Sequence, residues 1–202
     1  FGLELDELVY PFPDETEGGI HYFGAKGLLH MLESHLGLIG HPSDNEYLRI
    51  EQYRQLLREY LEEHANVFFS TSFEADQFAT ATALLDRRDE LVLAGWDFQV
   101  ASDSPNRLQV LAHLEATIQN TKNKTLLAAG FSDRFREILR KLKSRTQPIK
   151  KVFLNEPLEL LPIHFQQLFT TFSESNIKIE NLPLQETKGQ SDLVQFQSFL
   201  NS

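Results

Sequence analysis

Short apolar segments of strand length lie near both ends of this 202-residue chain, and a long stretch of helical pattern separates them. Residues 20–23 are followed by a helical pattern, and so are residues 151–154 and 177–182. Strands that alternate with helices are typical of a parallel sheet covered by helices. The two ends of the chain therefore predict one α/β layer that carries the helical middle as an insertion.

Apolar spacing and capping signals predict the elements between and around these strands. Ser43 with Glu46 and Thr71 with Glu74 form capping boxes, so each opens a helix. The expected helices are residues 28–36, 43–64, 71–95, 108–118, 132–144, 162–173 and 192–200. An extended segment is expected at residues 3–9 and a short strand at 67–70. The predicted domains are an α/β core of residues 1–42 and 147–202 and a helical insertion of residues 43–146.

Composition excludes several classes of protein. Hydrophobic residues make up 41% of the sequence, so the chain can bury a core. No apolar run reaches the roughly 20 residues that span a bilayer, and no secretory signal pattern opens the sequence. Cysteine is absent, which excludes disulfides, thiolate metal sites and a cysteine nucleophile. We expect a cytoplasmic location, no membrane partner, and a chain that is one segment of a longer protein because it begins with Phe1.

A strand followed by Gly24-Ala25-Lys26-Gly27 has the outline of a phosphate-binding loop. A working loop needs Gly-x-x-x-x-Gly-Lys-Ser/Thr, because several amides must converge on the phosphates while the lysine and hydroxyl reach the outer phosphates and the metal. Here the loop is too short, and Leu28-Leu29 follows the second glycine. We interpret the turn as a degenerate remnant of a nucleotide site, and its simplest role is a tight strand-to-helix connection.

Asn155 and Glu156 follow the strand at 151–154 and resemble the acidic pair with which helicases hold magnesium. Asparagine carries no charge and is a poorer ligand for a hard cation than a carboxylate. Pro157 also fixes the backbone directly after the pair. Neither segment is an intact Walker motif, so the sequence predicts a non-catalytic segment without a cofactor. The simplest reading is a polar turn that ends a buried strand.

Other catalytic and metal-binding patterns are missing from the sequence. Its seven histidines include no His-x-x-x-His pair, and His30 and His35 fall on different faces of one helix. No Gly-x-Ser-x-Gly elbow accompanies them. Trp96, after Ala94-Gly95, is expected to pack at the end of its helix. The sequence therefore predicts no metal site.

A block of positive charge lies in the second half of the chain, although the net charge is −10. Such a block can contact DNA phosphates and release their counterions. The alternative is a solvated helix face with cations in its last turns, where the helix dipole favours them. The candidate DNA contacts are Arg134, Arg136, Arg140, Lys141, Lys143, Arg145, Lys150 and Lys151.

Several stretches, in order along the chain, resemble one bacterial family. Residues 23–33 resemble its Gly-Pro-Arg-Gly-Leu-Leu segment. Residues 73–96 resemble its long helix with the pattern Asp-x-x-Ala-Thr, then Arg-Asp-Glu-Leu-x-x-Ala-Gly-Trp. Later blocks fit residues 156–162 and 192–193. The family is that of inactivated superfamily I helicases with a C-terminal PD-(D/E)XK nuclease, similar to the AddB subunit of AddAB-type double-strand-break repair enzymes.

The resemblance implies a degenerate RecA-like, P-loop helicase-like sheet with a large helical insertion. It implies that the parent chain is a bacterial DNA repair and recombination exonuclease whose nuclease motifs lie downstream. This segment would then be a non-catalytic, helicase-like scaffold that contacts DNA or a helicase-nuclease partner subunit. The alternatives are a protein–protein interaction module without nucleic-acid contact and, least favoured, an ATP-dependent enzyme with an unorthodox site.

Overall fold

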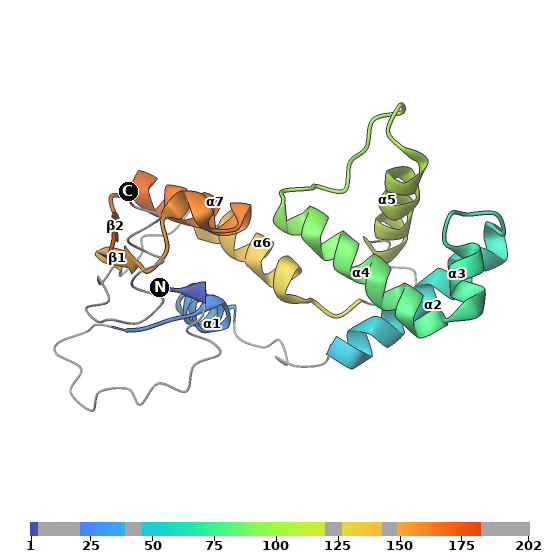
Figure 1. The fold of residues 1–202 in the computed structure, drawn as a ribbon, viewed down its shortest axis with the longest axis horizontal. Coiled ribbons are helices and arrows are strands. Elements are labelled where there is room, and N and C mark those ends of the chain that lie inside the picture. Colours follow the sequence, from blue (N-terminus) through green and yellow to red (C-terminus); the bar gives the residue numbers. More distant parts are fainter. Residues whose placement is uncertain (4–20, 39–45, 120–126, 143–148, 183–202) are drawn as a thin grey trace, which may run out of the picture.

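The computed structural model describes residues 1–3, 21–38, 46–119, 127–142 and 149–182, and within them the protein is predominantly helical (Figure 1). A two-stranded parallel sheet accompanies the helices. The elements are α1 (Ala25–Leu36), α2 (Glu46–Glu63), α3 (Ser70–Ala75), α4 (Gln77–Leu93), α5 (Asn106–Gln119), α6 (Phe131–Leu142), β1 (Lys151–Leu154), the 3-10 helix η2 (Leu158–Leu160), α7 (Ile163–Glu174) and β2 (Lys178–Asn181).

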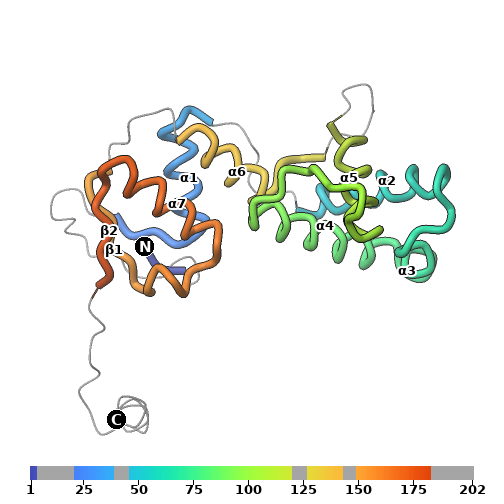
Figure 2. The backbone as a smooth tube through the Cα atoms, turned by 90° about the horizontal axis from the view of Figure 1, so that it is seen from above, coloured from blue at the N-terminus to red at the C-terminus, as the bar shows by residue number. Residues whose placement is uncertain are grey.

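The elements form two lobes side by side, as both views of the backbone show (Figures 1 and 2). The α/β lobe contains α1, α6, α7, β1 and β2, and its core includes buried side chains from each helix and from β1. The helical lobe contains α2, α3, α4 and α5, and it has a separate core. Each lobe therefore buries apolar surface of its own, as an independent core requires.

β1 and β2 pair in parallel, and α7 is the crossover between them. Lys151 lies opposite Lys178, and Phe153 lies opposite Glu180. The inward-facing residues of the pair join the core of the α/β lobe, where Leu154 is fully buried. This strand–helix–strand unit confirms the strands expected at 151–154 and 177–182.

The N-terminal segment, residues 1–3, extends this layer beyond β1. Phe1 N donates to the Phe153 carbonyl at 2.6 Å, and Asn155 N donates to the Phe1 carbonyl at 2.8 Å. These two bonds have the pattern of a parallel strand pair. The Phe1 ring packs on α7, with its centroid 5.0 Å from that of Phe165. The α/β layer is thus wider than its two assigned strands.

Most predicted helices are confirmed, with ends that differ by a few residues. Gly37 ends α1 as expected, with a left-handed backbone (φ 68°) that glycine adopts without steric cost. α2, α5, α6 and α7 lie where apolar spacing placed them. The helix expected at 192–200, the extended segment at 3–9 apart from Leu3, and Ser43 lie outside the described residues.

Three predictions differ from the structure. Residues 67–69 form a turn that enters α3, so the strand expected there is wrong. The helix expected from Thr71 to Gly95 is interrupted, because Asp76 ends α3 and caps α4. Residues 21–23 are not an assigned strand, and Ile20 lies outside the described part of the chain. A RecA-like sheet is therefore not established, whereas the coarser α/β arrangement is.

The sequence division at residue 146 also differs from how α6 packs. Phe135, Ile138 and Leu142 of α6 are buried in the core of the α/β lobe, together with α1 and α7. The helical lobe accordingly ends with α5, and α6 returns the chain to the first core. The N-terminal end of α6 nevertheless touches the helical lobe, and this junction carries most of the buried charge.

Candidate functional site

The Gly24 turn begins α1 as a plain connection into the helix. Gly24 is the N-cap residue, with an extended backbone (φ −86°, ψ −169°), and its carbonyl accepts from Leu28 N at 2.9 Å. Leu28 and Leu29, at the positions of the phosphate-loop lysine and hydroxyl, are 5% and 1% exposed. Lys26 is exposed in the first helical turn. Core side chains thus replace the groups that would bind outer phosphates and metal.

The N-terminal segment lies between the Gly24 turn and the end of β1. Gly2 N donates to the carbonyl of Phe23, the residue directly before Gly24, at 3.2 Å. On its other side the segment pairs with β1. Both nucleotide-site remnants therefore lie next to residues 1–3, and the backbone of these residues separates the two remnants.

Asn155 and Glu156 are engaged by this N-terminal segment. Glu156 Oε1 accepts from Leu3 N at 3.2 Å. A Cβ added at Gly2 would lie 2.7 Å from Asn155 Nδ2, so the asparagine side chain rests directly on that glycine. The other carboxylate oxygen, Glu156 Oε2, is buried and has no hydrogen-bond partner among the described residues. One carboxylate oxygen is thus used in holding the fold together.

Metal-binding groups are not gathered in the described residues. They include no cluster of three or more histidine, aspartate or glutamate side chains that could hold an ion. His164 is packed among Phe131, Phe135 and Phe165, and its burial lowers its pKa to about 4. Its imidazole is therefore neutral near pH 7 and belongs to the aromatic core.

Arg134, the first residue of the predicted DNA-binding block, is buried. Its Nε donates to Glu33 Oε1 at 2.6 Å, and the two side chains are 8% and 9% exposed. The pair joins α6 to α1 inside the α/β lobe. Arg134 is therefore a structural cation and does not lie on a surface that DNA could reach.

The remaining cations of α6 lie at its surface beside other groups. Arg136 is exposed, with its guanidinium carbon 4.3 Å from the centroid of the Phe98 ring. Arg140 is 72% exposed and pairs with Glu137, and Lys141 Nζ lies 3.6 Å from the same carboxylate. Exposed pairs of this kind contribute little stability, so these cations can exchange their partner for a phosphate.

The rest of the block lies at and before β1. Lys150 is exposed. Lys151 Nζ lies 2.6 Å from Glu180 Oε2 on β2. Lys143 and Arg145 lie outside the described residues. The predicted block is therefore divided between α6 and the sheet, with one member buried.

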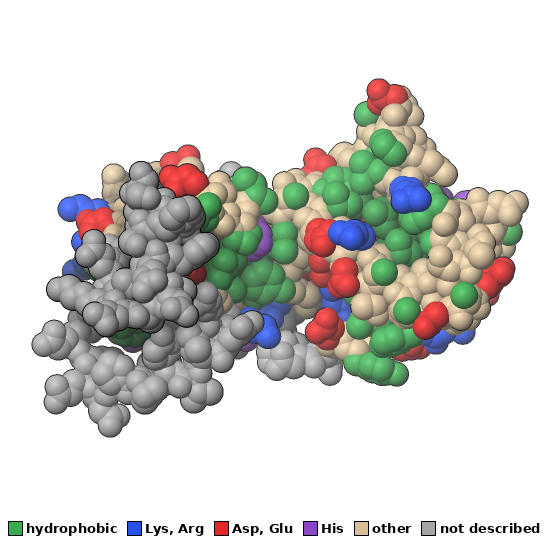
Figure 3. Space-filling model, viewed as in Figure 1, with side chains coloured by type: hydrophobic (Ala, Val, Ile, Leu, Met, Phe, Trp, Pro, Cys, Tyr) green, Lys and Arg blue, Asp and Glu red, His purple; other side chains and the backbone are tan. Residues whose placement is uncertain are grey.

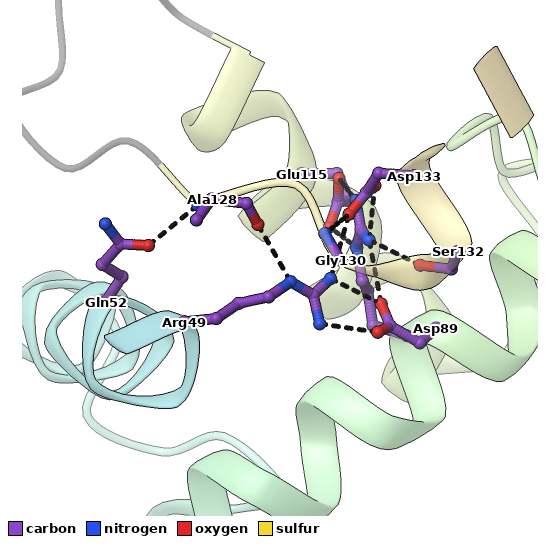
Figure 4. Close-up of polar contacts among 9 residues, drawn as sticks. Arg49, Gln52, Asp89, Glu115, Ala128, Gly130, Ser132 and Asp133 are labelled. Atoms are coloured by element: carbon purple, nitrogen blue, oxygen red, sulfur yellow. Dashed lines mark hydrogen bonds and ion pairs between the residues drawn. The ribbon is translucent and has the colours of Figure 1, made fainter. Parts of the chain in front are cut away.

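A buried ion network lies at the junction of the lobes (Figure 4). Arg88 of α4 is its centre. Arg88 Nε donates to Glu115 Oε1 of α5 at 2.8 Å, and Arg88 Nη1 lies 2.7 Å from Asp133 Oδ1 of α6. The side chains of Arg88 and Glu115 are only 4% and 2% exposed. This interlobe network therefore connects three helices through one guanidinium.

Arg49 of α2 completes the interlobe network. It donates to Asp89 through Nη1 at 2.6 Å and to Asp133 through Nη2 at 3.0 Å. Its Nε donates to the Ala128 carbonyl at 2.9 Å, which ties down the segment that leads into α6. Asp133 thus binds both guanidinium groups and links α6 to α2 and α4.

Electrostatics keep the interlobe network charged. Burial alone would raise the pKa of Asp89, but hydrogen bonds from Arg49 and Arg88 outweigh it, and the pKa lies below its usual value. Burial likewise opposes the charge of Arg88, yet Glu115 and Asp133 raise its pKa above the ordinary range. Arg88 and Asp89 therefore keep their charges near pH 7. The arrangement serves structure and offers neither a general acid nor a general base.

The sequence interpretation missed this network, although one signal for it was present. Ala81, Leu85, Arg88 and Val92 recur at spacings of four, three and four, so Arg88 occupies the buried stripe of α4. In the sequence, five consecutive charged residues, 86–90, interrupt the apolar pattern, so nothing within that run singles out Arg88. A cation on an apolar stripe predicts a buried partner, but not which helix supplies it.

The two lobes differ strongly in charge. Residues 46–119 carry thirteen acidic residues against six Lys/Arg. The described residues of the α/β lobe carry seven acidic residues against eight Lys/Arg. Figure 3 shows acidic side chains over the helical lobe. A polyanion would therefore be repelled by the helical lobe, and less so by the described part of the α/β lobe.

Comparisons with known proteins add no identification. The chain matches no protein-family model, no curated protein and no solved structure. None of the described helices combines the length and apolar character needed to cross a membrane.

Proposed function

We propose that this chain is a non-catalytic, helicase-derived scaffold from a bacterial double-strand-break repair exonuclease of the AddB-like kind. Its α/β lobe would be a degenerate RecA-like core, and the nuclease would lie elsewhere in the parent chain. The observation that carries the proposal is the N-terminal segment packed between the Gly24 turn and Asn155-Glu156. Two segments with the outline of a nucleotide site meet at one place, and backbone fills the space between them.

The scaffold is proposed to contact DNA through the α/β lobe. Near-balanced charge among the described residues of this lobe, and five exposed or half-exposed cations of the predicted block, support this choice. Lys143 and Arg145 belong to the same sequence block and remain part of the proposal. Arg134 is left out, because it is paired with Glu33 inside the lobe. The retained cations in the described residues are Arg136, Arg140, Lys141, Lys150 and Lys151.

Protein–protein interaction is the second candidate, and the helical lobe favours it. Tyr47 and Leu48 of α2 and Phe78 of α4 are 72%, 45% and 37% exposed. The rings of Tyr47 and Phe78 lie 5.3 Å apart, so these two exposed aromatic side chains form one patch. An apolar patch on an acidic lobe fits a protein surface better than a phosphate backbone. Under the proposed function, the protein bound by this patch would be a helicase partner subunit.

Nucleotide binding provides the first test. We expect millimolar ATP with Mg²⁺ to leave the melting temperature within about 1 °C, because the phosphate-binding groups are replaced. A ligand present at a hundred times its Kd would add about 2.7 kcal/mol of stability and raise the melting temperature by several degrees. An ATP-dependent rise that Lys26→Ala abolishes would contradict the non-catalytic assignment.

DNA binding provides the second test, measured by fluorescence anisotropy of the 202-residue chain over a salt series. We expect binding that weakens steeply with salt, since each neutralised phosphate releases counterions. The triple variant Arg136→Glu, Arg140→Glu, Lys141→Glu should lose it. A matched variant, Arg58→Glu, Arg87→Glu, Arg107→Glu, makes the same charge change on exposed positions of the helical lobe and should bind as the unmodified chain does. No binding at low salt would reject DNA contact and leave the interaction module.

A further inference from the structure

The outer face of the β1–β2 pair is exposed, although parallel strands are normally covered on both faces. Side chains alternate along each strand, so Val152 and Ile179 face the core while their neighbours face away from it. Phe153 is on the outer face and is 38% exposed. Lys151, Lys178 and Glu180 are exposed beside it. A parallel pair whose aromatic side chain is exposed among the described residues is expected to receive a partner there.

Charge on this outer face points to an anionic partner. Lys151 and Lys178 lie directly opposite each other in the parallel register. Like charges in that relation destabilise a sheet, and a bound anion would relieve the repulsion. Glu180 supplies part of that relief at present, through its contact with Lys151 at 2.6 Å. Among the described residues, the face therefore holds two lysines and one carboxylate.

The Phe153 ring restricts the class of anionic partner that fits this face. The Lys151 ammonium lies 4.3 Å from the centroid of the Phe153 ring, so a cation and an aromatic surface are presented together. Proteins that bind single-stranded nucleic acid combine these two groups, with the aromatic ring under a base and cations along the backbone. Bases in a duplex are already stacked and paired, so a flat exposed ring does not reach them.

We infer that the outer face of β1–β2 binds single-stranded nucleic acid, with Phe153 stacking on an unpaired base and Lys151 and Lys178 on the flanking phosphates. The inference rests on the proposed function. It assigns the DNA contact of the scaffold to the outer face of β1–β2 and to single-stranded DNA. Glu180 is the competing group: it holds Lys151 while the face is empty and releases it when a phosphate binds. Removing its charge therefore strengthens binding.

The experiment compares a fluorescent oligothymidine single strand with a hairpin duplex, by anisotropy, on the whole 202-residue chain. Phe153→Leu keeps an apolar side chain and removes the ring, so single-strand binding should weaken on the order of ten-fold while duplex binding stays the same. Phe78→Leu is the matched control: Phe78 is 37% exposed, on the acidic lobe, and its loss should change nothing.

Two charge variants test the same face in opposite directions. Lys178→Gln should weaken single-strand binding and lower the slope of its salt dependence by about one. Glu180→Gln should tighten binding a few-fold, which a purely structural carboxylate would not do. Each variant is compared only if its circular dichroism spectrum and denaturation curve match those of the unmodified chain.

The outcomes separate this inference from the proposed function. If Phe153→Leu and Phe78→Leu bind single strands equally well while the triple α6 variant loses DNA binding, the outer face is overturned and the scaffold proposal stands. If oligoglutamate displaces the single strand at equal charge concentration, the face is a general anion surface and the inference is wrong. If the unmodified chain binds neither strand form at low salt, DNA contact fails as a whole.

Discussion

Arg87 and Arg88 are adjacent in the sequence and occupy opposite environments. Arg87 is 71% exposed and pairs with Glu90 across one helical turn. Arg88 is 4% exposed and holds carboxylates from α4, α5 and α6. The exposed pair is screened by water, whereas the buried pair has exchanged its hydration for fixed partners. The same residue type is therefore expected to differ greatly in its contribution to stability.

We predict that Arg88→Ala destabilises the protein by about 3–5 kcal/mol, because it leaves Glu115 without its buried cation and Asp133 with Arg49 alone. Arg87→Ala, the matched control, should stay within about 0.5 kcal/mol. Urea denaturation measures both. The double variant Arg88→Leu, Glu115→Leu should recover part of the loss, since it removes both charges. Equal effects of the two single alanine variants would show that the interlobe network is not the stabilising element.

At the scale of elements, the interruption between α3 and α4 shows how a cap overrides an apolar pattern. Asp76 has an extended backbone (φ −152°, ψ 100°), and its carboxylate accepts from Ala79 N at 2.9 Å. The sequence pattern through residues 71–95 predicts one continuous helix. The aspartate side chain satisfies one of the free amides at a new helix start instead, so the chain turns there.

We predict that Asp76→Ala costs about 1 kcal/mol, because Ala79 N loses its acceptor. Asp86→Ala is the control: it removes the same charge from an exposed position within α4 and should change the stability by less than about 0.5 kcal/mol. Chemical denaturation gives both values. A loss at Asp86 equal to that at Asp76 would mean that net charge, not capping, accounts for the effect.

At the scale of the whole molecule, α6 is the element that both lobes share. Its apolar residues pack in the α/β core, while Asp133 in its first turn binds Arg49 and Arg88 from the helical lobe. Leu93 of α4 also packs against the α/β core, and the buried residues of the two cores are otherwise separate. Cooperative unfolding of the two lobes therefore depends on the interlobe network.

We predict that Asp133→Ala uncouples the lobes. Trp96 is the only tryptophan of the chain and packs against the core of the helical lobe, so its fluorescence reports that lobe. In the unmodified chain its unfolding transition should coincide with the loss of far-UV circular dichroism, as two-state behaviour requires. In the variant the two midpoints should separate. Glu137→Ala, which removes only ion pairs within α6, should leave them together.

Much of the local structure was predictable from the sequence, and the candidate site was not. Apolar spacing predicted α1, α2 and α5–α7, and short apolar runs predicted β1 and β2, because these signals are local. The division at residue 146 put α6 in the insertion, since no local signal says which core a helix joins. Arg134 and Arg140 belong to one sequence block. Only the three-dimensional structure shows that Arg134 forms a buried ion pair and Arg140 an exposed one.

By itself, the sequence determined which segments become helices and strands and that the Gly24 and Asn155-Glu156 segments lack the groups of a working nucleotide site. The folded structure was needed to show that the N-terminal segment lies between them, that Arg88 gathers carboxylates from three helices, and that Phe153 is exposed beside Lys151 and opposite Glu180. The reason is physical: spacing and caps act within a few residues, whereas these contacts join residues up to 153 positions apart.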